Sequence, residues 1–229
     1  MITAVTTCMG RKEHLEVTLP LMLKTFDRVV VVDWSCPQNS GAWAAQEGAS
    51  VIYKYGEKFF ERTSAKNLGF TLVQSEYVAF IDADSWCFQG MRDDLLSLLS
   101  PQIMVVAARN AKGLDLTDTF GFIACRSSAF RAVGGYDESF KGWGHEDSKL
   151  RGQLLLEAGL SVARLKPDSL GAIRHGNDVR GRYNDGDIFA TATPNWKKLY
   201  QYFEQFGIKD WMLDPRTESI TFKCQPTTK

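Results

Sequence analysis

Short apolar runs return five times in the first 110 residues, and each interval between them leaves room for a helix. The runs are rich in Val, Ile and Ala, and they cover residues 2–7, 28–33, 49–53, 77–82 and 103–108. Runs of this length and composition are typical of strands that are covered on both faces. Helical spacing appears between them, at Leu15, Leu19, Met22 and Phe26, and again in 41–46 and 92–99. The alternation predicts an α/β fold with a mostly parallel central sheet flanked by helices.

The pattern changes in the second half of the chain. We expect a strand at 121–126, a short helix at 127–133, and a longer helix at 146–158 after a glycine-rich turn. The dipeptide Thr193-Pro194 is expected to begin the last helix, because proline is favoured at the first helical position. No internal repeat or Pro/Gly/Ser linker interrupts the sequence, so the prediction is one domain over residues 1–229.

Charge and hydropathy exclude several classes of protein. Lys plus Arg and Asp plus Glu each number 27, whereas a general nucleic-acid binder would carry a basic excess. No stretch approaches the roughly 18–20 apolar residues of a membrane span, and the first residues lack the order of a signal peptide. Scattered cysteines without a CxxC pair favour free thiols and a location in the cytoplasm or at the inner face of a membrane: Cys8, Cys36, Cys87, Cys125 and Cys224.

Two carboxylates, Asp82 and Asp84, stand at the end of the fourth apolar run. Ligands of open α/β sheets bind beyond the carboxyl ends of the strands. Two anions this close repel each other unless a cation lies near. A hard divalent metal such as Mn²⁺ or Mg²⁺, together with a diphosphate, would supply that cation. The alternative is a solvated turn at a strand end, where aspartate is common.

A second motif, GGYDESFKGWGHED, covers residues 134–147. Trp143 stands between two glycines, so we expect it at the wall of a cleft, where its ring could stack on a sugar. Glu146 and Asp147 follow at the start of a predicted helix. Acids favour that position as caps, but capping explains only one of them and leaves the GWG segment unexplained.

These two motifs, FIDAD and GGYDESFKGWGHED, resemble those of GT-A fold glycosyltransferases of the family-2-like and galactosyltransferase type, which carry GWGxED. The resemblance implies that Asp84 binds the metal with the donor diphosphate and that Asp82 contacts the donor ribose or sugar. It implies that Trp143 borders the donor and acceptor sugars. It also implies that Asp147 is the catalytic base and that Glu146 binds sugar hydroxyls.

The resemblance extends to segments nearer the N-terminus. Thr6 and Arg11 follow the first strand, where relatives hold the nucleotide base and phosphate. Asp33 is implied as an acceptor for uracil N3–H, with a turn or cap as the alternative. Arg62 opens a segment similar to R-x-x-x-x-N-x-G and is implied to contact the nucleotide and phosphates, while Asn67 is implied to order the loop behind the site. A capped, solvated helix start is the alternative for this segment.

Later residues complete the implied donor site. Related enzymes place a histidine as a further metal ligand where His175 stands, and neutral imidazole suits Mn²⁺ better than Mg²⁺. Arg180 and Arg182 lie in a loop rich in Gly and Asp that could close over the diphosphate, although an ordinary exposed loop explains it equally well.

The predicted function is therefore a metal-dependent, inverting hexosyltransferase that moves Gal, GalNAc or GlcNAc from a UDP-sugar to a hydroxyl of a glycan or glycoconjugate acceptor. Residues 1–110 would bind the nucleotide sugar, 111–178 would bind the acceptor and catalyse, and 179–229 would form a C-terminal loop and helix. The tail is a candidate for a peripheral membrane contact. A non-catalytic sugar- or nucleotide-binding module and a sugar-nucleotide pyrophosphorylase remain as alternatives, while adjacent acids fit a glycoside hydrolase poorly.

Overall fold

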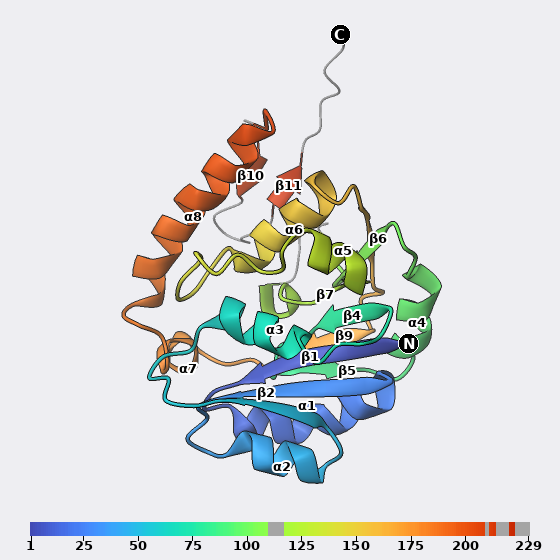
Figure 1. Cartoon of the computed structure of the whole chain (residues 1–229), viewed down its shortest axis with the longest axis vertical. Coiled ribbons are helices and arrows are strands. Elements are labelled where there is room, and N and C mark those ends of the chain that lie inside the picture. The colour runs from blue at the N-terminus through green and yellow to red at the C-terminus, as the bar shows by residue number, and fades with distance from the viewer. Residues whose placement is uncertain (110–116, 209–210, 214–219, 223–229) are drawn as a thin grey trace.

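The computed structural model describes residues 1–109, 117–208, 211–213 and 220–222 (Figure 1). Within them, a seven-stranded sheet has the order β3-β2-β1-β4-β7-β6-β8. Only β7 runs antiparallel to its neighbours, so the predicted mostly parallel α/β sheet is confirmed. The strands of this sheet are β1 (Ile2–Cys8), β2 (Arg28–Trp34), β3 (Ser50–Lys54), β4 (Tyr77–Phe80), β6 (Ile103–Val106), β7 (Ile123–Arg126) and β8 (Ser161–Arg164).

One face of the sheet is covered by α1 (Lys12–Thr25), α2 (Ser40–Gln46) and α4 (Met91–Leu98). Alternate side chains of a strand point to opposite faces, so Ala4 of β1 packs on this side. The helices contribute apolar residues at helical spacing, among them Leu15 and Leu19 of α1. This layer is the larger of the two cores that hold the sheet in place.

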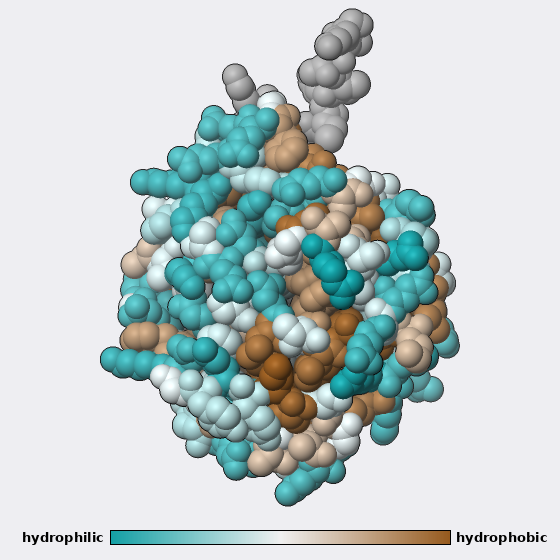
Figure 2. Space-filling model, in the orientation of Figure 1, coloured by the Kyte–Doolittle hydropathy of each residue, from teal (hydrophilic) through white to brown (hydrophobic). Residues whose placement is uncertain are grey.

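The opposite face is covered by α3 (Arg62–Phe70), α5 (Ser127–Ala132) and α6 (Glu146–Leu156). Val5 of β1 packs here, one residue after Ala4, together with Phe80 of β4. Figure 2 shows apolar atoms gathered in the middle of this view, around α3 and the strands beneath it. Partly buried apolar side chains on this side of the sheet include Ile52, Leu68, Phe70 and Leu72.

The last long helix, α8 (Ile188–Gln205), corrects one prediction. It begins six residues before Pro194, which therefore lies inside the helix and not at its start. The N-cap is Asp187, whose side chain accepts a hydrogen bond from the backbone N–H of Phe189. Leu199 and Phe203 of α8 pack on Phe140, so this helix closes over the glycine-rich loop that precedes α6.

Smaller elements fill the edges of the fold. They are the two-stranded sheets β5 (Ser85–Cys87) with β9 (Leu170–Ala172) and β10 (Trp211–Leu213) with β11 (Ile220–Phe222), the 3-10 helix η1 (Thr117–Thr119) and the short helix α7 (Asn177–Gly181). Cys8, Cys36, Cys87 and Cys125 are free thiols, while Cys224 lies outside the described residues. Over those residues, the helices lack the length and apolar character that crossing a membrane would require.

Candidate active site

A cleft of about 160 Å³ opens where β1 and β4 end and α3 and α6 begin. It joins the two sequence motifs, because both Asp82 and Asp84 and both Glu146 and Asp147 line it. Predicted residues that also line it are Arg11, Arg62, Trp143 and His175. Further lining residues are Thr7, Met9, Phe60, Lys66, Ala83, Asp118, Phe120, Gly121, Gly144, His145 and Ser148.

Asp84 is the centre of a polar cluster on the side of the cleft formed by the ends of β1 and β4. Its Oδ2 accepts a hydrogen bond from Arg11 Nη1 at 2.7 Å and lies 2.6 Å from His175 Nε2. Arg11 Nη1 is also 2.9 Å from that imidazole nitrogen. Burial alone would raise the pKa of Asp84, but the contacts with His175 and Arg11 lower it below its usual range. Asp84 is therefore ionised at neutral pH.

His175 is fixed from a second side by a residue that the sequence did not mark as functional. Its ring stacks on His14 of α1, with centroids 5.5 Å apart and planes 17° apart. Burial, and then the charge of Arg11, lower the pKa of His14, so this ring is neutral at pH 7. The stacking sets the plane of the His175 imidazole, which brings Nε2 onto Asp84.

Asp82 differs from Asp84 because no cation of the described residues is hydrogen-bonded to it directly. Its nearest cationic partner is Lys66, whose Nζ lies 3.6 Å from Asp82 Oδ1. Burial raises the pKa of Asp82, and the charge of Lys66 opposes that rise. Two carboxylates one residue apart thus have opposite shifts, because one is paired at hydrogen-bond distance and the other is not.

The second acidic pair lies in the first turn of α6. Glu146 is buried, and burial followed by the charge of Asp147 raises its pKa to about 7. Asp147 Oδ1 accepts hydrogen bonds from Lys66 Nζ at 2.9 Å and from Tyr136 Oη at 3.2 Å. As in the pair of Asp82 and Asp84, one acid, Asp147, is hydrogen-bonded to a cation. No ion pair to the other, Glu146, is found among the described residues.

The residue before this pair, His145, has a left-handed backbone with φ of 71°. Such a conformation costs free energy in a side chain with Cβ and is found preferentially at functional sites. Burial lowers the pKa of His145 to about 4, so the imidazole is neutral at pH 7. Its ring lines the cleft and can offer one donor and one acceptor nitrogen to a ligand.

Trp143 reaches the cleft wall through the glycines that flank it. Gly142 has φ of +70°, and a Cβ there would overlap Thr191 of α8. Thr191 Oγ1 accepts a hydrogen bond from the Trp143 backbone N–H at 3.1 Å, and Asn195 Nδ2 donates to the Gly144 carbonyl at 3.0 Å. The glycine segment is therefore anchored to α8, and the indole stays half-buried at the cleft.

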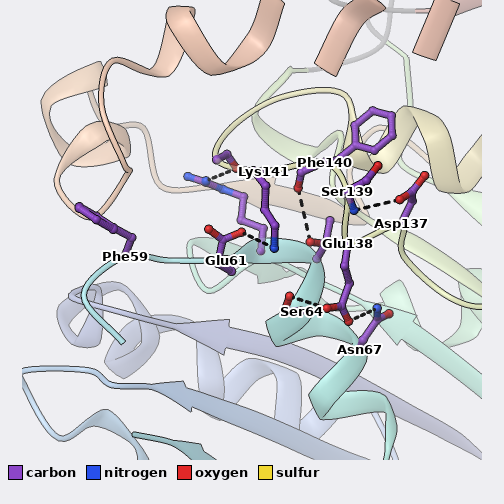
Figure 3. A network of polar contacts seen from close by, with 12 residues as sticks. Phe59, Glu61, Ser64, Asn67, Asp137, Glu138, Ser139, Phe140 and Lys141 are labelled. Atoms are coloured by element: carbon purple, nitrogen blue, oxygen red, sulfur yellow. Dashed lines mark hydrogen bonds and ion pairs between the residues drawn. The ribbon is translucent and has the colours of Figure 1, made fainter. Parts of the chain in front are cut away.

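A network of side chains ties the same loop to α3 (Figure 3). Ser64 Oγ donates to Glu138 Oε2 at 2.8 Å, and Asn67 Nδ2 donates to Glu138 Oε1 at 2.9 Å. Asn67 also exchanges two hydrogen bonds with the backbone of Tyr136. Figure 3 further shows Lys141 pointing to Glu61, an ion pair of 3.5 Å. Asn67 thus orders the loop that carries Tyr136 toward the cleft.

Arg62 links this network to the cleft. Its Nη1 donates to the Gly142 carbonyl at 2.9 Å, and its guanidinium lies 5.3 Å from the centroid of the Phe60 ring. Burial lowers the pKa of Arg62, although a guanidinium remains charged under all ordinary conditions. The positive charge faces the cleft beside Glu146 and Asp147.

Thr6 and Asp33 do not reach the cleft. Thr6 is fully buried on the α1 side of β1, while Thr7, one residue later, lines the cleft. Asp33 Oδ1 accepts from the Cys36 backbone N–H at 2.8 Å, and Oδ2 accepts from Gly41 N–H at 2.6 Å and Ser40 Oγ at 3.1 Å. Its carboxylate is occupied in holding the start of α2, as in the turn-or-cap alternative. The donor-binding roles of both residues remain predictions.

The segment with the two predicted lid arginines packs beside the end of β1. Tyr183 lies against Gly10, whose φ of +68° and lack of Cβ leave room for the ring. The Tyr183 carbonyl accepts a hydrogen bond from Phe60 N–H at 2.7 Å. Arg182 is exposed and outside the cleft lining, and Arg180 lies in α7 with its side chain outside the described part of the chain.

Lys66 is the most important residue that sequence reasoning missed. A lysine in a short amphipathic helix is usually solvated, and nothing local marks Lys66 as buried. Its side chain is 4% exposed and contacts acids that lie 16 and 81 residues away in sequence. Thr7 and Phe60 were also missed, and the period-two pattern of β1 could have found Thr7.

Asp84 and His175 fit a divalent metal as a partial ligand set. Within residues 1–109 and 117–208, no group of three or more His, Cys, Asp or Glu side chains converges on a common point. Carboxylate oxygen and imidazole nitrogen are both ligands of Mn²⁺, and the two lie 2.6 Å apart at the cleft. The remaining ligands would have to come from a bound diphosphate and water.

Comparisons with known proteins agree with this architecture. Residues 103–178 match a family model described as the N-terminal domain of galactosyltransferase. That segment contains the whole GGYDESFKGWGHED motif and ends three residues after His175. No curated protein matches the chain.

Solved structures of transferases share the fold at low sequence identity. The catalytic domain of Drosophila β1,4-galactosyltransferase 7, solved with xylobiose, is 18% identical with a TM-score of 0.57, over 85% of this chain and 79% of that one. A Pyrobaculum calidifontis mannosyltransferase, solved with GDP-Man and Mn²⁺, is 14% identical with a TM-score of 0.64, over 87% of this chain and 68% of that one. Glucosyl-3-phosphoglycerate synthase from Mycobacterium tuberculosis, solved with Mn²⁺, UDP and phosphoglyceric acid, is 14% identical with a TM-score of 0.58, over 85% of this chain and 78% of that one. The predicted resemblance is confirmed, and the findings support a glycosyltransferase.

Proposed function

We propose that this chain, which has the fold of GT-A glycosyltransferases, transfers a sugar from a UDP-sugar to a hydroxyl group with inversion at the anomeric carbon. The observation that carries the proposal is the meeting of two acidic pairs and Trp143 in one cleft, with Arg11 and Arg62 beside them. A donor needs cations for its diphosphate, and an acceptor needs a base and a surface for its sugar ring. This cleft offers each of these on residues that are already held in place.

The donor diphosphate would lie against Asp84, Arg11 and His175. Asp84 and His175 are the residues that would hold Mn²⁺ or Mg²⁺, which when bound stabilises the negative charge of the leaving diphosphate. Arg11 contributes a fixed positive charge 2.7 Å from Asp84 and can turn to a phosphate oxygen once the carboxylate has another partner. Asp82 would then contact the ribose or the sugar of the donor.

The acceptor would lie on the α6 side of the cleft. Asp147 takes the proton of the attacking hydroxyl, and Trp143 supplies a flat apolar face for a sugar ring. Glu146 and the neutral His145 offer hydrogen-bonding groups to sugar hydroxyls. Gal, GalNAc and GlcNAc are the donor sugars we propose, and a glycan or glycoconjugate is the acceptor class.

A thermal-shift screen of nucleotide sugars with and without Mn²⁺ tests the donor class, because a ligand that binds only the native state raises Tm. The proposal expects a metal-dependent rise with UDP-sugars and UDP. Shifts that occur only with GDP- or CDP-sugars would contradict the donor assignment. Release of UDP from a donor that causes a shift, measured with the purified protein, separates an enzyme from a binding module.

A further inference from the structure

Lys66 is a buried lysine of α3 that contacts the acidic pairs on both sides of the cleft. Its Nζ donates to Asp147 Oδ1 at 2.9 Å and lies 3.6 Å from Asp82 Oδ1. Removing an ammonium group from water is costly unless the charge is paired, so a buried lysine in this position needs a compensating partner. The shorter of the two contacts identifies Asp147 as that partner.

The charge state of Lys66 follows from its surroundings. Burial alone would lower its pKa, but the charge of Asp147, with smaller contributions from Tyr136 and Asp82, raises the pKa well above its usual range. Lys66 is therefore an ammonium at neutral pH. The interaction is reciprocal, since a contact that favours the ammonium also favours the ionised form of the carboxyl group it touches.

Glu146 shows what the same environment does to a carboxyl group without such a contact. It is next to Asp147 in sequence, lies in the same helical turn and is buried, and no ion pair to it is found among the described residues. Burial and the charge of Asp147 raise its pKa to about 7. A general base must be ionised before it can accept a proton, so the neighbour that is bonded to Lys66 is the better candidate.

The same contacts orient the Asp147 carboxylate. Lys66 Nζ and Tyr136 Oη both donate to Oδ1, at 2.9 and 3.2 Å, and Lys66 Nζ in turn lies 4.9 Å from the centroid of the Tyr136 ring. One oxygen of the carboxylate is thereby held by two donors. No hydrogen bond to the other oxygen, Oδ2, is found among the described residues, so Oδ2 is available to a group that enters the cleft, which Asp147 lines.

We propose that Lys66 is a positioning residue for the general base: its hydrogen bond to Oδ1 holds the Asp147 carboxylate and directs Oδ2 to the acceptor hydroxyl. The inference rests on the function proposed above. In the transfer step, Oδ2 takes the hydroxyl proton while the acceptor oxygen bonds to the anomeric carbon. The bond from that carbon to the diphosphate breaks, and its electron pair leaves with the diphosphate. Lys66 keeps its protons and touches no substrate.

The charged and titratable groups that face Asp147 come from four parts of the fold. They are Lys66 and Arg62 of α3, Asp82 after β4, Tyr136 of the loop, and Glu146 of α6 itself. Among the cations of the described residues, Lys66 alone is at hydrogen-bond distance from Asp147. Substituting Lys66 therefore removes the contact that offsets the two neighbouring acids.

A measurement that needs no activity tests whether Lys66 acts on the Asp147 carboxyl group. The protein is labelled with ¹³C at the aspartate carboxyl carbons, and the Asp147 signal is assigned by its loss in Asp147→Asn. In Lys66→Met we expect the midpoint of its pH titration to rise by about one unit or more, the scale of a lost opposite charge. In Lys66→Arg, which keeps the charge, it should stay near the wild-type value. An unmoved midpoint in Lys66→Met overturns the inference, and Lys66→Gln serves if the Met variant does not fold.

The pH profile of kcat tests whether this contact matters for the transfer step. Its acid limb should move to higher pH in Lys66→Met by the same interval, and Lys66→Arg should restore the limb. The pH-independent kcat above that limb should fall about tenfold in Lys66→Met, because the carboxylate loses the donor that orients it. Lys24→Met, an exposed lysine of α1, is the matched control and should keep the wild-type profile.

A double variant distinguishes action through Asp147 from a merely structural role. If Lys66 acts through Asp147, then Lys66→Met lowers kcat by less than about twofold when added to Asp147→Asn. A further tenfold loss in that background would overturn the inference. A wild-type protein that neither transfers nor hydrolyses any UDP-sugar would defeat the proposed function, while the carboxyl titration would still decide the role of Lys66.

Discussion

The two sides of the cleft carry the same residue types in different surroundings. On the side proposed to hold the donor, Asp84 is hydrogen-bonded to Arg11 and contacts His175, while the nearest cation to Asp82 in the described residues is Lys66, at 3.6 Å. On the acceptor side, Asp147 is bonded to Lys66, while Glu146 is buried beside it with a pKa of about 7. Each pair thus contains one acid that is hydrogen-bonded to a cation and one whose pKa is raised by burial.

The two pairs are also held in place by different means. Asp82 and Asp84 directly follow β4, which is paired with β1 and β7 in the central sheet. Glu146 and Asp147 begin a helix after a long glycine-rich loop, which side chains of α3 and α8 attach to the rest of the fold. The sheet therefore positions the donor pair, and side-chain contacts position the acceptor pair.

The largest expected effect comes from removing the fixed anion of the donor side. In Asp84→Ala we expect Mn²⁺-dependent UDP binding to be lost and kcat to fall by about 10³-fold, since a catalytic metal stabilises charge by several kcal/mol. Isothermal calorimetry with UDP, with and without Mn²⁺, measures the binding. Asp93→Ala, an exposed acid of α4, is the control. Undiminished metal-dependent affinity would contradict the assignment of Asp84.

Removing Asp147, the acid that is hydrogen-bonded to Lys66, should affect only the chemical step. In Asp147→Asn, kcat should fall by about 10²-fold or more, the contribution of a positioned general base. UDP affinity in the presence of Mn²⁺ should stay at the wild-type value, which distinguishes this variant from Asp84→Ala. Turnover near the wild-type rate would move the base elsewhere in the cleft, and Asp93→Asn controls for the loss of one charge.

Glu146 should make the free energy of unfolding depend on pH. Its pKa rises from 4.5 to about 7 on folding, so the folded state holds a proton that the unfolded state has lost between these values. The stability that this group contributes is fully present below pH 4.5 and is lost as the pH rises through 7. Glu146→Gln has no ionisable group at this position and does not undergo this loss. Its free energy of unfolding relative to that of the wild type should therefore rise by about 3 kcal/mol across the interval between the two pKa values.

Urea unfolding at pH 5 and pH 8 measures this difference between Glu146→Gln and the wild-type protein. A stability difference between the two proteins that is the same at both pH values would mean that Glu146 ionises normally. The acceptor pair would then lack the asymmetry of the donor pair.

The smallest expected effect concerns the attachment of the acceptor loop to α3. In Ser64→Ala the 2.8 Å hydrogen bond to Glu138 is lost, and the free energy of unfolding should fall by about 1 kcal/mol or less. Ser161→Ala, at an exposed position in β8, is the control. Metal-dependent UDP binding should not change, because the sheet holds the donor pair. A loss of that binding would show that the two sides of the cleft are not positioned independently.

Local patterns were sufficient for six of the seven strands of the central sheet and for both acidic motifs, whereas β8 was not predicted. The apolar runs at 2–7 and 77–82 became β1 and β4, and Asp82 and Asp84 lie at the cleft as strand-end carboxylates should. The same reasoning misplaced the start of α8, because it weighted Pro194 above the stronger N-cap signal of Asp187. It could not choose between a cap and a ligand for Asp33, whose oxygens hold the start of α2.

By itself the sequence determined the order of strands and helices and the chemistry available at the strand ends, because hydrophobic periodicity and residue type are local properties. Only the tertiary structure decided which acids are paired. Lys66 and Asp147 are separated by 81 residues, and their contact exists because α3 and α6 pack on the same face of the sheet. Proton affinity depends on burial and on the distance to the nearest charge, and neither quantity is defined until the chain is folded.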